Sequence, residues 1–105
     1  MTLSEIDKEC KKLGLNYAYG SFDSPTNPPH LIGRVVETDN FSADNKVWYK
    51  QPTFRLELTT LKKDLELQKK IEDNLLKDIY WNKTEQEITD EGVYNTSYFF
   101  NIKEE

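Results

Sequence analysis

The clearest hydrophobic pattern in the chain is a strict alternation over residues 53–60, TFRLELTT. Phe54, Leu56 and Leu58 fall on one face of an extended segment, and polar residues fall on the other. A period of two is typical of a β-strand with one buried and one solvated face. We therefore predict a strand here, in an antiparallel sheet that is covered on a single side.

Two other segments, residues 2–13 and 64–77, have the hydrophobic spacing of amphipathic helices. Thr2 or Ser4 can cap the first helix, and Asp64 is well suited to cap the second. The remaining positions of the second helix are Lys, Glu, Gln and Asp, which we expect on its solvent face. The apolar stripes consist of Leu3, Ile6, Cys10 and Leu13 in the first helix, and of Leu67, Ile71, Leu75 and Leu76 in the second.

Shorter apolar runs predict the remaining strands, over residues 15–22, 30–37, 46–50, 79–88 and 93–102. The order along the chain is therefore helix, strands, helix, strands. Two helices with one apolar stripe each can both lie on one face of an antiparallel or mixed sheet. We predict an α+β fold, a two-layer sandwich with two helices packed on one face of the sheet.

Several places interrupt this pattern. Residues 23–29 hold three of the four prolines, which predicts an extended connection. Residues 39–45 (DNFSADN) have the chemistry of a turn, because Asp, Asn and Ser bond to their own backbone. The Gln-Pro pair at 51–52 predicts a break or a bulge. Gly33, inside a predicted strand, indicates a bulge or the close approach of another group.

Length and charge limit the classes of function. A chain of 105 residues predicts a single α+β domain over 1–105, with frayed ends at 1–2 and 103–105. The net charge of −5 argues against direct binding to nucleic acid, which needs a basic face. One cysteine and one histidine argue against a disulfide within the chain and against a metal site. We expect no cofactor and no membrane span, and a reducing cytoplasm as the compartment.

Few residues are candidates for catalysis. His30 is the only possible histidine base, and it follows two prolines at the start of a strand. Cys10 lies on a helix stripe, which is typical of a small buried hydrophobic residue. Glu85 and Glu87 share one strand face and could do acid–base work or hold a cation. Because acidic residues are abundant, we interpret this pair as a solvated face and predict that the protein is not an enzyme.

The aromatic residues suggest a protein interface. Trp48 lies on the opposite strand face from Val47 and Tyr49, so it is exposed if those two are core. The alternative is that Trp48 packs under a loop, and Trp81 presents the same choice. Phe41 is an apolar residue inside a predicted turn. Phe41, Trp48 and Trp81 are therefore the interface candidates, while the acidic balance argues against the stacking of RNA bases on them.

An ordered set of motifs covers residues 28–102. It consists of PPHLI at 28–32, NFSADNKVWYK at 40–50, FRLELTT at 54–60, KKDLEL at 62–67, and T-E-x-x-I-x-x-E-x-x-Y-x-x-x-Y-x-F-x-I at 84–102. The set resembles the small tail-completion, or tail-terminator, proteins of long-tailed phages and prophages of Gram-positive bacteria. Such proteins usually carry proline after the helix-capping aspartate, where this chain has Leu65. Proline is favoured but not required at the first helical position.

The resemblance implies a structural function without catalysis. Members of this family form a ring, typically of six subunits, that stops polymerisation of the tail tube and joins it to the connector of the filled head. The expected partners are copies of the chain, the tail-tube protein and the head connector or adaptor proteins. A monomer in solution is compatible with this, because many assembly proteins wait for their template. The expected location is the virion, at the head–tail junction, after assembly in the host cytoplasm.

Three alternatives remain open. The first is a head–tail adaptor of the same assembly. The second is a small nucleic-acid or regulatory binding module on the same fold, which filter binding with single-stranded RNA would reveal. The third is a small enzyme that uses Glu85 and Glu87, for which a deep carboxylate-lined pocket would be the signature.

Overall fold

The computed structural model describes the backbone of residues 1–43 and 46–103, and the side chains of residues 1–37 and 51–103. This part of the chain contains two helices and a five-stranded sheet, which confirms the predicted α+β class. In chain order the elements are α1 (Leu3–Lys12), β1 (Asn16–Tyr19), β2 (His30–Ala43), β3 (Lys46–Thr60), α2 (Leu65–Asn74), β4 (Trp81–Ile88) and β5 (Val93–Asn101).

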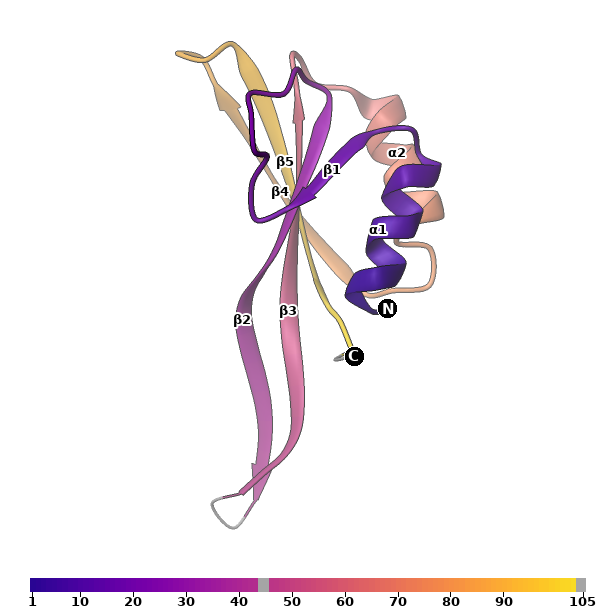
Figure 1. Cartoon of the computed structure of the whole chain (residues 1–105), viewed down its shortest axis with the longest axis vertical. Helices are drawn as coiled ribbons and strands as arrows, with labels where there is room; N and C mark the ends of the chain where they lie inside the picture. Colours follow the sequence, from indigo (N-terminus) through magenta and orange to yellow (C-terminus); the bar gives the residue numbers. More distant parts are fainter. Residues whose placement is uncertain (44–45, 104–105) are drawn as a thin grey trace.

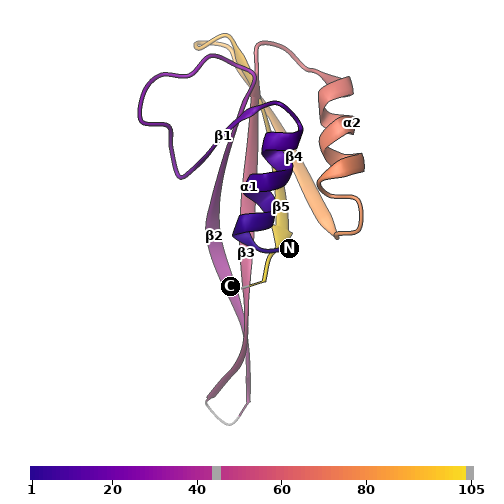
Figure 2. The ribbon, with the colours of Figure 1, turned by 45° about the vertical axis from the view of Figure 1, so that its right-hand side comes forward.

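The sheet is mixed, with strand order β1-β2-β3-β5-β4. β1 runs parallel to β2, and the other neighbours are antiparallel. Both helices lie on the same side of the sheet, α1 over β1 and β2 and α2 over β4 and β5 (Figures 1 and 2). The opposite face carries no helix of the described part of the chain.

The core lies on the helix side of β3. Phe54, Leu56 and Leu58 are buried there, as their alternation predicts. The register places Phe54 opposite Phe100 of β5 and Leu58 opposite Leu31 of β2. Each such side chain contributes about 1.5–3 kcal/mol by leaving water. The buried hydrophobic residues are Ile6, Cys10, Leu31, Phe54, Leu56, Leu58, Ile71, Leu75, Leu76, Tyr98, Phe100 and Ile102.

Both helices begin where the sequence indicates. Thr2 caps α1, and its hydroxyl accepts a hydrogen bond from the Glu5 N–H at 3.3 Å. Asp64 caps α2 through a bond from the Leu67 N–H at 3.0 Å. α2 ends at Asn74, three residues before the predicted end. The next two residues stay buried, because the Leu75 and Leu76 N–H groups both donate to the carbonyl of Ile71.

The predicted turn over residues 39–45 is wrong for most of its length. Residues 39–43 belong to β2, and β3 begins at Lys46. Only residues 44–45, which lie outside the described part, separate the two strands. The pairing of β2 with β3 supplies partners for the backbone groups of this segment, so Asp, Asn and Ser do not need to form a turn.

The predicted break at residues 51–52 is also wrong. Pro52 lies within β3, opposite Thr38 of β2. Its carbonyl accepts a hydrogen bond from the Ile102 N–H at 3.0 Å, at the point where the β5 ladder ends. Proline has no N–H to donate, but at the end of a ladder this costs only one hydrogen bond and is tolerated. The register shift falls on the opposite strand, between Val35 and Glu37.

The two ends of the described chain meet. The Lys103 N–H donates to the Met1 carbonyl at 2.8 Å, and Thr2 caps α1. The fraying that we expect at residues 1–2 and 103–105 stays a prediction, and residues 104–105 lie outside the part that the structure describes.

Gly33 marks a close approach, one of the two possibilities that the sequence indicates. A Cβ built on Gly33 would overlap the ring of Phe54, with Cε2 at 2.6 Å, and would lie 3.0 Å from the Tyr17 hydroxyl. Both rings are held by the core, so neither can move aside freely. The absence of a side chain at Gly33 leaves room for the Phe54 ring on the helix side of the sheet.

We therefore expect Gly33→Ala to lower the free energy of unfolding by about 1–3 kcal/mol through overpacking. Urea unfolding followed by circular dichroism measures the change. Gly33→Ala combined with Phe54→Leu should destabilise less than the sum of the two single changes, because the smaller side chain makes room. An unchanged midpoint for Gly33→Ala would contradict this packing.

Candidate protein interface

A two-stranded arm projects from the body of the molecule (Figure 1). We define the arm as residues 38–43 of β2 and 46–51 of β3. The register of β1 ends at Gly33 and that of β5 begins at Thr53, so in the described structure the arm strands pair only with each other. The molecule is accordingly elongated, 50 Å along its longest axis and 28 and 26 Å across it. A hairpin alone is marginally stable in water, so contact with another surface would stabilise the arm.

Two of the predicted interface residues lie on the arm. Phe41 of β2 is paired with Tyr49 of β3, and Trp48 lies at the register shift that follows. Their side chains are outside the described residues, so their role stays a prediction. No strand of the described residues pairs with the outer edges of this part of β2 and β3, and such edges can pair with another chain.

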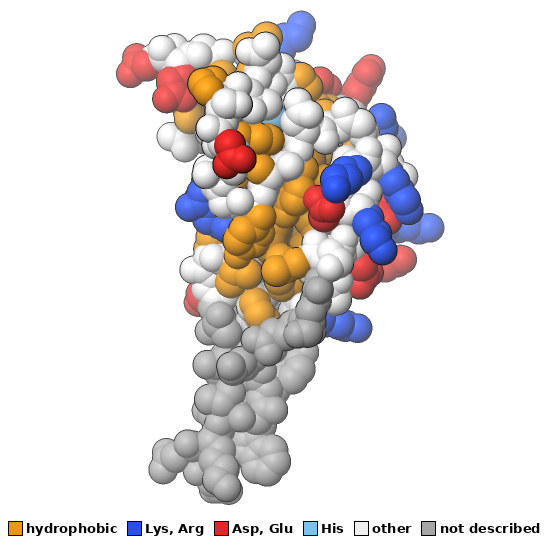
Figure 3. Space-filling view, in the orientation of Figure 1, with side chains coloured by type: hydrophobic (Ala, Val, Ile, Leu, Met, Phe, Trp, Pro, Cys, Tyr) orange, Lys and Arg blue, Asp and Glu red, His pale blue; other side chains and the backbone are white. Residues whose placement is uncertain are grey.

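An apolar patch lies at the base of the arm, over β1 and β2 and beside α1 (Figure 3). A shallow groove there is lined by Leu3, Tyr17 and Tyr19 among others. Tyr19 is 54% exposed although it is large and aromatic. Its hydroxyl accepts a hydrogen bond from the Val35 N–H at 3.3 Å, just beyond the end of the β1–β2 pairing. The patch therefore adjoins the free edge of β2.

Trp81, the third candidate, is partly buried in the first position of β4. Its ring meets the Tyr98 ring edge-on, with 5.5 Å between centroids. The Lys83 ammonium lies 5.8 Å from the Trp81 ring centroid. Trp81 thus packs against the core, and a partner could contact only the part of its side chain that remains exposed to solvent.

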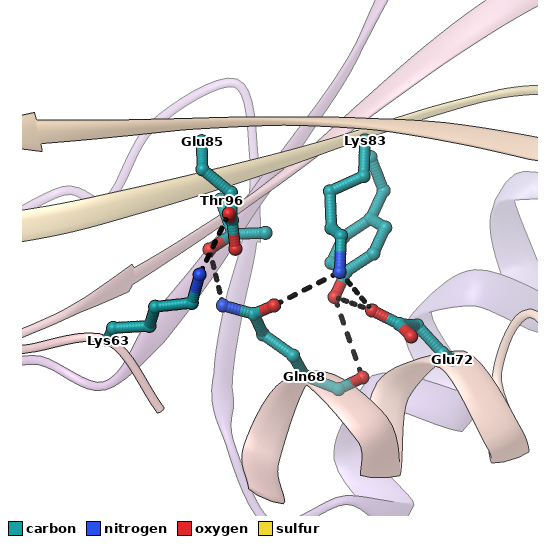
Figure 4. A network of polar contacts seen from close by, with 7 residues as sticks. Lys63, Gln68, Glu72, Lys83, Glu85 and Thr96 are labelled. Atoms are coloured by element: carbon teal, nitrogen blue, oxygen red, sulfur yellow. Dashed lines mark hydrogen bonds and ion pairs between the residues drawn. The ribbon is translucent and has the colours of Figure 1, made fainter. Parts of the chain in front are cut away.

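A polar network lies between α2 and the sheet (Figure 4). The Gln68 amide donates to the Thr96 hydroxyl at 3.2 Å. Lys83 donates to the Gln68 side-chain oxygen at 3.2 Å and to Glu72 at 2.9 Å, while the Tyr98 hydroxyl donates to Glu72 at 2.8 Å. Burial, together with the Glu72 carboxylate, raises the pKa of Tyr98 and keeps its hydroxyl protonated as a donor. We interpret the network as structural, because its members satisfy one another.

Gln68 corrects a sequence-based prediction. It was expected on the solvent face of the second helix, but it is 2% exposed and faces the sheet. Helical spacing places Gln68 three residues before Ile71 and one after Leu67, on the apolar side. The polar partners on β4 and β5, which helical spacing cannot reveal, make its burial possible.

Glu85 and Glu87 have different surroundings. Lys63 forms an ion pair with Glu85 at 3.2 Å. Desolvation opposes ionisation of Glu85, but hydrogen bonds from Lys63, Gln68 and Tyr94, together with the charge of Lys63, outweigh it and lower the pKa of the carboxyl group. Glu87 lines a shallow groove with Leu61 and Lys62, and Glu85 is not among the residues that line it.

His30 and Cys10 lie on different sides of the sheet. Leu31 faces the helices, so the neighbouring His30 faces the other side, where Phe22 meets its ring at 5.2 Å between centroids. Desolvation lowers the pKa of His30, although the charge of Glu57 acts in the opposite direction. Cys10 is buried in the core under α1, and burial raises its pKa to about 12. The two residues are therefore not placed to act as a pair.

Two arginines lie side by side on the open face of the sheet. Arg34 of β2 is directly opposite Arg55 of β3. Arg34 donates to the carbonyl of Gly20 at 2.7 Å, while Arg55 donates to Glu57 at 2.5 Å and to the hydroxyl of Ser97 at 3.3 Å. A depression of about 160 Å³ is lined by Ile32, Arg34, Arg55 and Glu57. The pair cannot be recognised in the sequence, because only the strand register brings the two residues together.

Within residues 1–43 and 46–103, no three His, Cys, Asp or Glu side chains are grouped so as to hold a metal ion. None of the described helices is long and apolar enough to cross a membrane. A comparison with protein-family models, a search of curated proteins and a search of solved structures each found no match to this chain.

We expect Tyr98→Phe to destabilise the protein by about 1–3 kcal/mol, because it removes the donor to the partly buried Glu72 carboxylate. Tyr80→Phe is the matched control, since Tyr80 is 85% exposed. Urea unfolding of both variants measures the difference. Equal midpoints for the two variants would show that the hydroxyl of Tyr98 is not part of a stabilising network.

We also expect the Cys10 thiol to be unreactive in the folded protein. The rise of its pKa from 9.0 to about 12 reduces the thiolate fraction about 1,000-fold, and the side chain has no exposed surface. Alkylation by iodoacetamide at pH 8, followed by mass spectrometry, should be slow in buffer and rapid in guanidinium chloride. Rapid alkylation without denaturant would contradict the packing of α1 on the sheet.

Proposed function

We propose that this chain is a structural protein of phage assembly that caps the tail tube and joins it to the head connector through protein–protein contacts. Two kinds of support agree. The sequence motifs resemble those of tail-completion proteins, and the motif over residues 40–50 coincides with the arm. The arm is the observation that carries the proposal, because a two-stranded extension with free edges is suited to reach a neighbouring subunit.

The body and the arm have complementary tasks in this proposal. The body consists of the sheet and the two helices that lie on one side of it. The arm and the apolar patch at its base are different surfaces of one subunit. A closed ring needs such a pair of different surfaces, because each subunit meets the next through a heterologous contact.

The ring that we propose consists of copies of this chain, six if the resemblance extends to subunit number. It lies at the head–tail junction of the virion and contacts the tail-tube protein on one side and the connector on the other.

Deletion of the gene in its phage tests the proposal. We expect lysates with filled heads beside unattached, overlong tails in electron micrographs, because nothing would stop the tail tube from growing. Unattached tails of normal length would instead identify a head–tail adaptor. Normal virions would exclude a role in completing the tail.

Complementation of that deletion tests the arm. In the test variant, Asn-Gly replaces residues 40–50 and joins Asp39 to Gln51 in a tight hairpin. The side chains described for residues 1–37 and 51–103 form a core among themselves, so we expect a folded body with an almost unchanged thermal midpoint. This variant should fail to restore infectious particles, whereas the control Tyr80→Ala, at an exposed position away from the arm, should restore them. Restoration by the armless chain would show that the arm is dispensable.

A further inference from the structure

The open face of the sheet carries an unusual charge arrangement. Arg34 and Arg55 are direct cross-strand partners, and like charges in this position destabilise a sheet. Glu57 offsets part of the repulsion through its ion pair with Arg55. Two guanidinium groups and one carboxylate leave a local surplus of one positive charge, although the chain as a whole carries −5.

The two guanidinium groups can bind a further acceptor. Gly20 takes one donor of Arg34, and Glu57 and Ser97 take two donors of Arg55. A guanidinium group has five donors in a planar fork that fits a carboxylate. The Arg34 residue is exposed, and the Arg55 side chain is 41% exposed, so both can be reached from solvent.

The same chain offers a matching acidic surface. The turn between β4 and β5 carries Asp90 and Glu91, both exposed, and Figure 3 shows acidic side chains at the end of this hairpin. The turn is well defined, because the Glu91 N–H donates to Ile88 at 3.3 Å and the Gly92 N–H donates to Thr89 at 3.2 Å. It presents two carboxylates on a short protruding tip.

The Asp90–Glu91 turn is too far from Arg55 to contact the arginine pair of its own subunit. β5 leaves the turn beside Thr60, and Arg55 lies five residues further along β3, about 17 Å away at the usual strand rise. A turn that meets an arginine pair must therefore come from a different copy. Such a contact joins two different surfaces and is heterologous, as a ring requires.

We propose that the Arg34–Arg55 pair binds the carboxylates of the Asp90–Glu91 turn of a second copy of this chain. This inference rests on the proposed function and deepens it, because it names one contact through which neighbouring subunits of the ring recognise each other. The charges choose the partner and the register, while apolar contacts elsewhere can supply affinity.

Charge reversal tests the contact. The first variant is Arg34→Glu with Arg55→Glu, and the second is Asp90→Arg with Glu91→Arg. Each alone brings like charges together and should weaken self-association by a factor on the order of 10–100, measured by sedimentation velocity at low salt. An equimolar mixture of the two variants should associate again. The glutamates at positions 34 and 55 of the first variant then meet the arginines in the turn of the second, and the intact arginine pair of the second meets the intact acidic turn of the first. A chain with all four changes should also recover, and wild-type association should weaken as salt rises.

Matched controls separate this contact from net charge. Lys69→Glu with Lys70→Glu changes the charge of the chain as much as the first variant does, and Glu66→Arg with Asp73→Arg changes it as much as the second. All four control residues are exposed on α2, so both controls should associate like wild type. Circular dichroism checks that every variant is folded, and Arg34→Gln with Arg55→Gln is a milder alternative that should weaken association in the same direction.

The proposal is overturned if wild type shows no concentration-dependent association at low salt, if the first variant associates like wild type, or if neither the mixture nor the fourfold variant recovers. The gene-deletion phenotype is an independent measurement. Overlong unattached tails together with an inert arginine pair would leave the tail-completion function standing and remove only this contact.

Discussion

The structure depends on β3, which is hydrogen-bonded to β2 on one side and to β5 on the other. Its alternating residues Phe54, Leu56 and Leu58 form the floor on which both helices pack. The buried hydrophobic residues of the described part gather on that side, while the opposite face of the sheet carries Arg34, Arg55 and Glu57. The same strand continues beyond the body and forms half of the arm. One strand therefore determines the core, the open face and the projecting surface together.

Features encoded by short-range pattern could be predicted from the sequence. The alternation over residues 53–60 identified the central strand, and the stripes of the two helices with caps at Thr2 and Asp64 identified α1 and α2. These signals suffice for the α+β class, because each segment has one apolar face to bury. Gly33 was also informative, since a glycine inside a strand indicates a crowded position.

Features that depend on pairing between distant residues could not be predicted. Residues 39–43 have turn-forming side chains, and only the register of β2 against β3 makes them a strand. Gln68 looks like a surface residue until Thr96 and Lys83 supply its partners. In both cases tertiary contacts outweigh the local preference of the residue.

In the candidate site, too, some residues could be predicted from the local sequence and others only from the pairing of strands. Phe41 and Trp48 stood out as surplus aromatic residues, and the pairing places them on the arm, while the packing of Trp81 on Tyr98 depends on the sheet order. Arg34 and Arg55 belong to different predicted strands, and neither is unusual alone. Their proximity follows from a register that a bulge on β2 could have shifted by one residue, which would have sent one of them to the other face.

The unbroken path of β3 has a mechanical consequence. A tensile load applied to the arm passes along β3 into its ladder with β5. Residues Thr53 to Thr60 of β3 take part in this ladder. The hydrogen bonds of an antiparallel ladder lie perpendicular to the strands, so a pull along β3 shears all of them at once instead of unzipping them singly. An extension anchored in this manner can transmit force to the middle of the sheet without first peeling away from its edge.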